Sequence, residues 1–239
     1  MSKSKLAVVA LLLLVTATWA MGASHAGGKH GAGAYNPKID PANFQTTVDN
    51  PYLPHVPGTT FKLLEKKGKH TSENEITVTH DTKVIMGVTC VVVRDVVKEK
   101  GILKEETFDW YAQDKQGSVW YFGEDTKEYH PHGKVSTEGS WEAGVGRNQP
   151  GIIMLGHPVP GAPYRQEYGP GHAEDMGQVV AVNDSVTVPC GSFGGCVRTK
   201  EWSLLEPGTE KKWYAKGVGV VRTESTTREV AMLVSMTRP

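Results

Sequence analysis

The stretch EETFDWYAQDKQGSVWYFGED, residues 105–125, decides the fold class of this chain. It holds two tryptophans, two phenylalanines and two tyrosines, interleaved with acidic residues on both sides of a short polar segment. That segment, AQDKQGSV, fits a type I turn with Gly117 in the left-handed conformation, so that Asp114 pairs with Ser118. Alternation with a period of two around such a turn predicts a β-hairpin.

The register of this hairpin sorts its side chains onto two faces. It pairs Tyr111 with Tyr121, Trp110 with Phe122, and Asp109 with Gly123. One face is then a hydrophobic core face, made of Phe108, Trp110, Ala112, Trp120 and Phe122. The other is amphipathic and carries Thr107, Asp109, Tyr111, Gln113, Tyr121 and Asp125. Two interpretations of this amphipathic face remain open, a solvated outer surface or the lining of a concave site.

The same alternation recurs along the rest of the chain and predicts an all-β protein. Period-two patterns and β-branched runs lie between Gly, Pro and Asp turns. Strands joined by short turns suggest an antiparallel meander that curves into a half-barrel or a barrel. The predicted strands span residues 59–67, 74–87, 88–101, 102–114, 117–125, 126–130, 163–169, 173–189, 196–207, 209–226 and 228–239.

One long segment interrupts this pattern. Residues 136–163, STEGSWEAGVGRNQPGIIMLGHPVPGAP, are rich in glycine and proline and too long for an ordinary hairpin loop. WEAG and GIIMLG give the segment apolar anchors, so we expect it to fold down as a lid or plug.

The first residues predict export from the cytoplasm. Two lysines precede an apolar run over residues 6–15 and then small residues, which is the pattern of a secretory signal peptide ending near residue 26. The run is shorter than the roughly 20 residues that a membrane-spanning helix needs, so no integral span is expected after cleavage. Residues 27–41, rich in glycine and histidine, are predicted to form a flexible arm ahead of one β domain over residues 42–239.

The charge balance narrows the range of partners. The chain has 26 basic and 26 acidic residues, and this gives no long-range field for nucleic acid or an anionic membrane. A small-molecule ligand is the expected partner. The oligomeric state does not follow from the sequence.

The three cysteines are expected in an oxidising compartment. Cys190 and Cys196 flank a glycine-rich segment in VPCGSFGGCVRT, and a disulfide between them is favoured over a metal site. Cys90, in VTCVVVRDVV, is expected to be a buried thiol.

The chain ends with a recognisable hairpin. KKWYAKGVGVVRTE, over residues 211–224, resembles the closing hairpin of bacterial extracytoplasmic β families, in which a WYAPGVGLV-type segment precedes the last strand. Some of these families form half-barrels that hold lipids, as the lipoprotein carriers do. The chain has Lys216 where proline is common. The resemblance implies a curved sheet in the cell envelope and transfers no functional residue.

Familiar catalytic signatures are missing from the sequence. It has no G-x-S-x-G, H-E-x-x-H, P-loop or dinucleotide-binding glycine pattern. If the protein is an enzyme, acid and base chemistry within a curved sheet would use Asp109, Tyr111, His157, Arg165 and Glu167. Arg165 and Glu167 share one face of a predicted strand, and a structural ion pair is the other interpretation of these two residues.

A cation site is a further possibility in GPGHAEDMG. His172, Glu174 and Asp175 lie in an oxygen-rich turn that could hold a divalent cation, although its spacing is not that of an EF-hand loop. Solvated turn residues are the alternative. No cofactor is predicted otherwise.

Three functions are compatible with these observations. The favoured hypothesis is a secreted or periplasmic protein that binds an apolar or amphipathic small molecule, with Tyr111, Gln113, Tyr121 and Trp141 at the ligand. The alternatives are a cavity-based lyase, isomerase or hydrolase, and a structural or interaction module of the envelope.

Overall fold

The computed structural model describes residues 35–239, and over this range the protein is all-β. The predicted signal peptide, residues 1–26, and most of the predicted arm lie outside the described residues. Two short 3-10 turns, η1 (Pro41–Asn43) and η2 (Pro131–Gly133), accompany the strands. The strands are β1 (Phe44–Gln45), β2 (Thr60–Lys67), β3 (His70–Ile85), β4 (Val88–Glu99), β5 (Ile102–Asp114), β6 (Val119–Tyr129), β7 (Val135–Ser136), β8 (Trp141–Glu142), β9 (Gln149–Met154), β10 (Tyr164–Arg165), β11 (Glu167–Tyr168), β12 (Asp175–Val188), β13 (Gly191–Ser203), β14 (Glu210–Ala215), β15 (Gly219–Ser225) and β16 (Glu229–Thr237).

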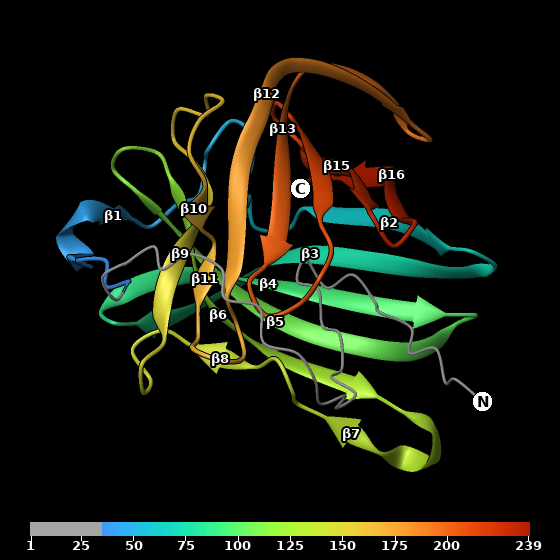
Figure 1. Ribbon diagram of the computed structural model, residues 1–239, viewed down its shortest axis with the longest axis horizontal. Helices are drawn as coiled ribbons and strands as arrows, with labels where there is room; N and C mark the ends of the chain where they lie inside the picture. Colours follow the sequence, from blue (N-terminus) through green and yellow to red (C-terminus); the bar gives the residue numbers. More distant parts are fainter. Residues whose placement is uncertain (1–34) are drawn as a thin grey trace, which may run out of the picture.

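These strands form one antiparallel sheet that is nearly closed into a barrel, as predicted. Its order is β10-β12-β13-β14-β15-β16-β2-β3-β4-β5-β6-β9-β11, with β1, β7 and β8 added at its borders. Long strands β3 to β6 lie side by side, and β12 and β13 stand across them (Figure 1). Consecutive β10 and β11 pair with opposite ends of the sheet, β12 and β9, so residues 164–168 form the seam of the barrel.

The hairpin of residues 105–125 has the predicted turn. The Asp114 amide donates to the Ser118 carbonyl, and Gly117 has a φ of 88°. Tyr111 pairs with Tyr121, as expected.

The predicted pairing of Asp109 is wrong, because β6 carries a β-bulge. Asp109 pairs with Glu124 rather than with Gly123, which has a φ of 123°. A Cβ at Gly123 would overlap the carbonyl oxygen of Trp141 in β8, and this close approach explains the glycine. The extra residue turns Glu124 inward and leaves Asp125 exposed, so Asp125 does not belong to the amphipathic face.

Both faces of the hairpin are buried. Trp110 and Phe122 lie on the core face, where Phe44 of β1 packs edge-on against Phe122 at 5.6 Å between ring centroids and the Lys83 ammonium sits 3.4 Å from the Trp110 ring centre. The amphipathic face, with Asp109 and Tyr111, lines the inside of the barrel. The interpretation as a concave lining is therefore the correct one, and the solvated surface is excluded.

The segment predicted to be a lid forms part of the barrel wall instead. Residues 149–154, which contain most of GIIMLG, are strand β9, and β7 and β8 pair with the border of β6. The expected anchors are confirmed, since Trp141 and Met154 are buried. Their apolar side chains fit a half-buried strand as well as a lid, so composition could not distinguish the two.

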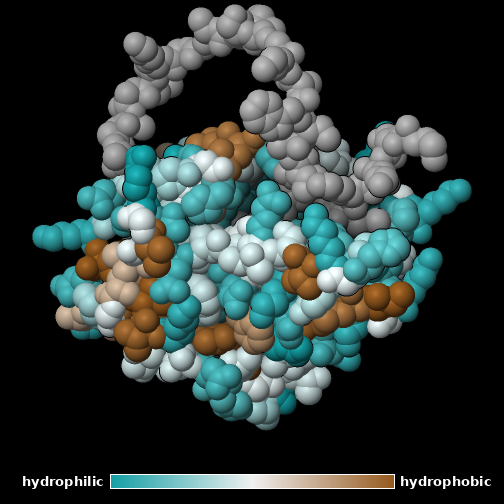
Figure 2. Space-filling view, turned by 90° about the horizontal axis from the view of Figure 1, so that it is seen from below, coloured by the Kyte–Doolittle hydropathy of each residue, from teal (hydrophilic) through white to brown (hydrophobic). Residues whose placement is uncertain are grey.

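The described end of the predicted arm is held by the barrel. The Tyr35 hydroxyl donates to the carbonyl of Pro150 at 3.0 Å, and its ring lies 5.5 Å from that of Tyr168. Residues 35–41 are therefore docked rather than free. On the face of the molecule shown in Figure 2, apolar side chains occur in separate groups among hydrophilic ones.

Candidate functional site

A proline-rich loop caps one end of the barrel. The Gln113 side chain of β5 accepts from the backbone amides of Asp49 and Asn50 at 2.9 and 2.7 Å, and the side-chain amide of Asn50 donates to the Gly117 carbonyl at 2.7 Å. These bonds hold residues 48–55, in which Leu53 and His55 are buried. Sequence reasoning missed this cap. Its signal was NPYLPHVPG, whose three prolines favour a fixed, extended path.

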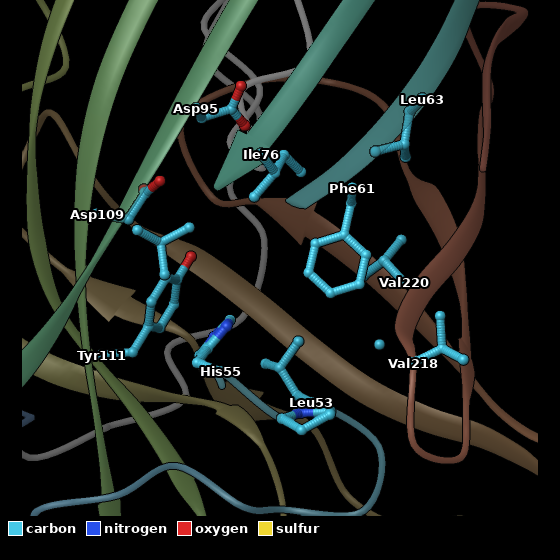
Figure 3. Close-up of a pocket in the computed structure, with 13 residues that line it drawn as sticks. Leu53, His55, Phe61, Leu63, Ile76, Asp95, Asp109, Tyr111, Val218 and Val220 are labelled. Carbon is cyan, nitrogen blue, oxygen red and sulfur yellow. The ribbon is translucent and has the colours of Figure 1, made fainter. Parts of the chain in front are cut away.

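Between the cap and the sheet lies a narrow pocket (Figure 3). The pocket has a volume of about 550 Å³ when the part open to solvent is included. The space inside it that the centre of a water molecule can occupy is only about 50 Å³. Asp109 and Tyr111 stand on one side, and Phe61 and Val220 on the other (Figure 3). The lining consists of Leu53, Pro54, His55, Phe61, Leu63, Ile76, Val93, Asp95, Asp109, Tyr111, Val218, Gly219 and Val220.

Two aspartates from adjacent strands form the acidic side of this pocket. Asp95 of β4 pairs with Thr107, and Asp109 of β5 pairs with Val93, so the two carboxyls are diagonal neighbours on the inner face. They are only 4% and 6% exposed. Asp95 accepts a long hydrogen bond from Asn74 through one oxygen, at 3.4 Å.

Asp109 belongs to an acid–phenol–acid chain. The Tyr121 hydroxyl lies 2.7 Å from Asp109 Oδ1 and 3.1 Å from Glu124 Oε2. A phenol has one proton, so it donates to one carboxyl and accepts from the other, and the second carboxyl must be protonated for both bonds to form. The bulge in β6 creates this chain by bringing Glu124 opposite Asp109.

Burial strongly favours the neutral form of these acids. It raises the pKa of Asp109 to about 7, although the hydrogen bond from Tyr121 acts in the opposite direction. Burial also raises the pKa of Asp95 well above its ordinary value, and the neighbouring Asp109, Glu105 and Glu65 add to this effect. The pKa of Glu105 rises to about 8, chiefly through burial.

A stack of rings continues from the cap into the interior. His55 lies 4.6 Å from Tyr111, Tyr111 is stacked 5.0 Å from Tyr121, and Tyr121 packs edge-on against Trp141 at 5.5 Å. Burial lowers the pKa of His55 to about 4, so its imidazole is neutral near pH 7. The stack fixes the position of Tyr111 beside the acids.

Two polar atoms of the pocket residues are not satisfied within the described part of the chain. Asp95 Oδ1 and His55 Nε2 are both buried and have no hydrogen-bond partner there. A buried polar group without a partner costs about 1–3 kcal/mol, and such groups are therefore rare unless something else binds them. Both side chains line the same pocket.

The interior also holds a separate structural ion cluster. Lys212 of β14 lies 2.7 Å from Glu201 and 3.5 Å from Glu210, and all three are buried. Burial lowers the pKa of Lys212, but these two carboxylates outweigh burial and raise it above its ordinary value. This lysine is thus committed to β13 and β14 carboxylates rather than to Asp95 and Asp109.

The five residues of the catalytic hypothesis are not gathered in one pocket. Asp109 and Tyr111 line the pocket under the cap, whereas His157 is exposed beside Tyr52 in a different hollow. Arg165 forms its ion pair with Glu174 at 3.2 Å, outside the Asp109 pocket, so it does not complete the predicted set. Glu167 is buried, and burial together with Asp175 raises its pKa.

Of the four predicted ligand-binding residues, only Tyr111 lines the pocket directly. Tyr121 and Trp141 lie behind it in the ring stack, and Gln113 holds the cap. Sequence reasoning missed Asp95, His55 and the apolar wall formed by Phe61, Ile76 and Val220. These residues come from β4, the cap and strands β2, β3 and β15, and only the closed sheet brings them together.

The predicted cation site is not assembled. Glu174 is engaged by Arg165 and by the Gly171 amide, while His172 is exposed. Burial raises the pKa of Asp175 to about 6. Among residues 35–239, no group of three or more histidine, cysteine, aspartate or glutamate side chains is placed to hold a metal ion.

The predicted disulfide is also wrong. Cys190 and Cys196 are free thiols, the first exposed and the second buried. The segment GSFGGC is not a loop between them but the start of β13, and the turn consists of Pro189 and Cys190, between the paired residues Val188 and Gly191. Cys196 therefore sits several residues along the strand, within an apolar cluster that includes Trp213. Cys90 is a buried thiol, as expected.

Comparisons of the chain with protein-family models, curated proteins and solved structures found no match. Within the described residues, no helix has the length and apolar character needed to cross a membrane.

Proposed function

We propose that this protein is a secreted or periplasmic binding protein for a small amphipathic molecule, held in the pocket between the cap and the sheet. The observation that carries the proposal is the pairing of an apolar wall with two buried polar atoms, Asp95 Oδ1 and His55 Nε2, that lack partners in the described chain. Ligand sites typically combine such a wall with a few placed polar groups.

The dimensions of the pocket set the shape of the ligand. Its narrow interior suits an unbranched chain or a single small ring lying between Phe61 and Tyr111. The resemblance of residues 211–224 to the closing hairpin of half-barrel lipid carriers agrees with an elongated apolar ligand, and the N-terminal signal-peptide pattern agrees with export.

The binding hypothesis is favoured over the enzyme hypothesis because two members of the catalytic set lie elsewhere. His157 is exposed and Arg165 is paired with Glu174, which leaves Asp109 and Tyr111 without the imidazole and the guanidinium group of the predicted set.

Isothermal titration calorimetry with 1-hexanol, hexanoate and hexylamine tests the proposal. At least one of them should bind with 1:1 stoichiometry to the wild type. Val220→Phe fills the pocket and should abolish this binding, whereas Val84→Phe, at a position 66% exposed, should leave it unchanged. A cooperative thermal unfolding transition near that of the wild type establishes that each variant folds. Binding that survives Val220→Phe, or no binding of any of the three, would refute the proposal.

A further inference from the structure

We propose, on the basis of the binding function proposed above, that the polar group of the ligand is a protonated amine, received by the carboxyls of Asp95 and Asp109. The amine would donate hydrogen bonds to Asp95 Oδ1 and to Oδ2 of Asp109, the oxygen that Tyr121 does not bind. Its substituent would extend along the apolar wall formed by Phe61, Ile76 and Val220.

The first argument is the sign of the charges around the pocket. Asp95 and Asp109 are diagonal neighbours on the adjacent strands β4 and β5, and both are more than nine-tenths buried. Among residues 35–239 the one buried lysine or arginine, Lys212, is bound to Glu201 and Glu210. A positive ligand would therefore stabilise the ionised form of these two acids and be attracted by it, whereas the acids offer a carboxylate ligand no positive charge.

The second argument is independent of the charges. Asp95 Oδ1 is a buried acceptor atom without a donor in the described chain, and Asp95 lines the pocket. A protonated amine carries several N–H donors on one nitrogen, so a single small group can reach the Asp95 acceptor inside the narrow pocket.

The ring stack places a neutral acceptor beside the acids. Both faces of Tyr111 are covered, by His55 and by Tyr121, so the ring offers the amine its hydroxyl oxygen rather than a face. Neutral His55 adds a dipole without adding a positive charge that would compete with the amine.

Binding should release protons to solvent. The free pocket holds its acids largely neutral, and an ammonium ion favours their ionised form, so a carboxyl proton leaves as the amine binds. The affinity for an amine should therefore rise with pH through about 7, where Asp109 loses its proton in the free protein, and rise further as Asp95 ionises. The titratable groups facing this site from the packed elements are His55, Glu65, Asp95, Glu105, Asp109, Tyr111, Tyr121, Glu124 and Glu167.

Calorimetry with isosteric probes distinguishes this inference from the function on which it rests. Near pH 7.5, hexylamine should bind about tenfold or more tightly than 1-hexanol, and hexanoate should bind least. The heat of hexylamine binding should differ between phosphate and Tris buffers in the sense of proton release. Asp95→Asn and Asp109→Asn should each remove the preference for the amine while keeping 1-hexanol binding. Asp125→Asn, at an exposed position of β6, is the matched control.

Each outcome has a definite meaning. Equal affinity for hexylamine and 1-hexanol, or stronger binding of hexanoate, would overturn the amine inference and leave the binding function standing. No binding of any probe would reject both. If one Asn variant does not fold, the other variant and the proton release of the wild type still decide the question.

Discussion

The buried acids should make the protein less stable as pH rises, and Asp109→Asn should remove part of that loss. Asp109 has an ordinary pKa of 3.8 and a folded-state pKa of about 7. Above pH 3.8 the unfolded chain ionises at this position while the folded chain keeps its proton. The free energy of unfolding therefore falls as pH rises, until the folded carboxyl also ionises near pH 7.

The size of the effect follows from the interval between these pKa values. From pH 4.5 to pH 7 the cost grows over about 2.5 pH units, and at 1.36 kcal/mol for each unit this amounts to about 3 kcal/mol. Glu65 and Glu105 act in the same direction, because burial raises their pKa values to about 7 and about 8. The wild type should thus be several kcal/mol less stable near pH 8 than near pH 4.5.

The assay is urea unfolding followed by tryptophan fluorescence at about pH 4.5 and pH 8. An asparagine cannot ionise, and its carbonyl oxygen still accepts from Tyr121. Asp109→Asn should therefore lose about 3 kcal/mol less than the wild type between the two pH values. Any cost of placing the new amide group cancels in this difference. Asp125→Asn, on the exposed side of β6, should follow the wild type. The reasoning fails if wild-type stability rises with pH over this range, or if Asp109→Asn shows the same pH dependence as the wild type.

Four further substitutions or reactions address the fold and the cap. Gly123→Ala should lower the free energy of unfolding in urea by at least about 2 kcal/mol, because its Cβ would meet the Trp141 carbonyl and φ is 123°. Gly101→Ala, which has open space around its Cβ, should lower it less. Equal losses in the two variants would contradict the role of the Trp141 contact. Lys212→Met should destabilise by about 3–5 kcal/mol, since it leaves Glu201 and Glu210 buried without their cation; a neutral effect would show that these acids are protonated in the variant at no cost. Asn50→Ala should raise hydrogen exchange of the Tyr52 amide, which donates to Asn50 Oδ1 at 2.8 Å, while exchange in β14 stays unchanged. A thiol reagent should modify one cysteine in the native protein, Cys190, and all three after unfolding, and rapid native labelling of Cys196 would contradict its burial.

The local part of the fold could be predicted from the sequence, because it depends on neighbours along the chain. The turn at Asp114–Ser118 and strand β5 have the expected positions. The β6 bulge could not be predicted, since Gly123 is required there by Trp141, which reaches it only once β8 has docked.

The site was predicted in part for the same reason. The alternation in β5 correctly placed Asp109 and Tyr111 on one face, but it could not decide whether that face was inside. Burial of the polar face depends on closure of the sheet and on a cap anchored by Gln113, and both are long-range contacts. The disulfide prediction failed for a different reason, because the glycine-rich composition of residues 191–196 suggested a loop where β13 runs.

The seam at residues 164–168 has a consequence for how the chain folds. Most neighbouring strands are joined by short connections and can pair as soon as both exist, whereas β10 and β11 must meet partners on two sides at once. Each is two residues long, and Pro150 opposite Glu167 has no amide proton to give. We expect this ring closure to be the slow, late event of folding and the first to reverse. An intermediate with a complete but open sheet would then expose its acidic interior to water, where those carboxyls ionise freely, so alkaline conditions should delay closure more than they delay hairpin formation.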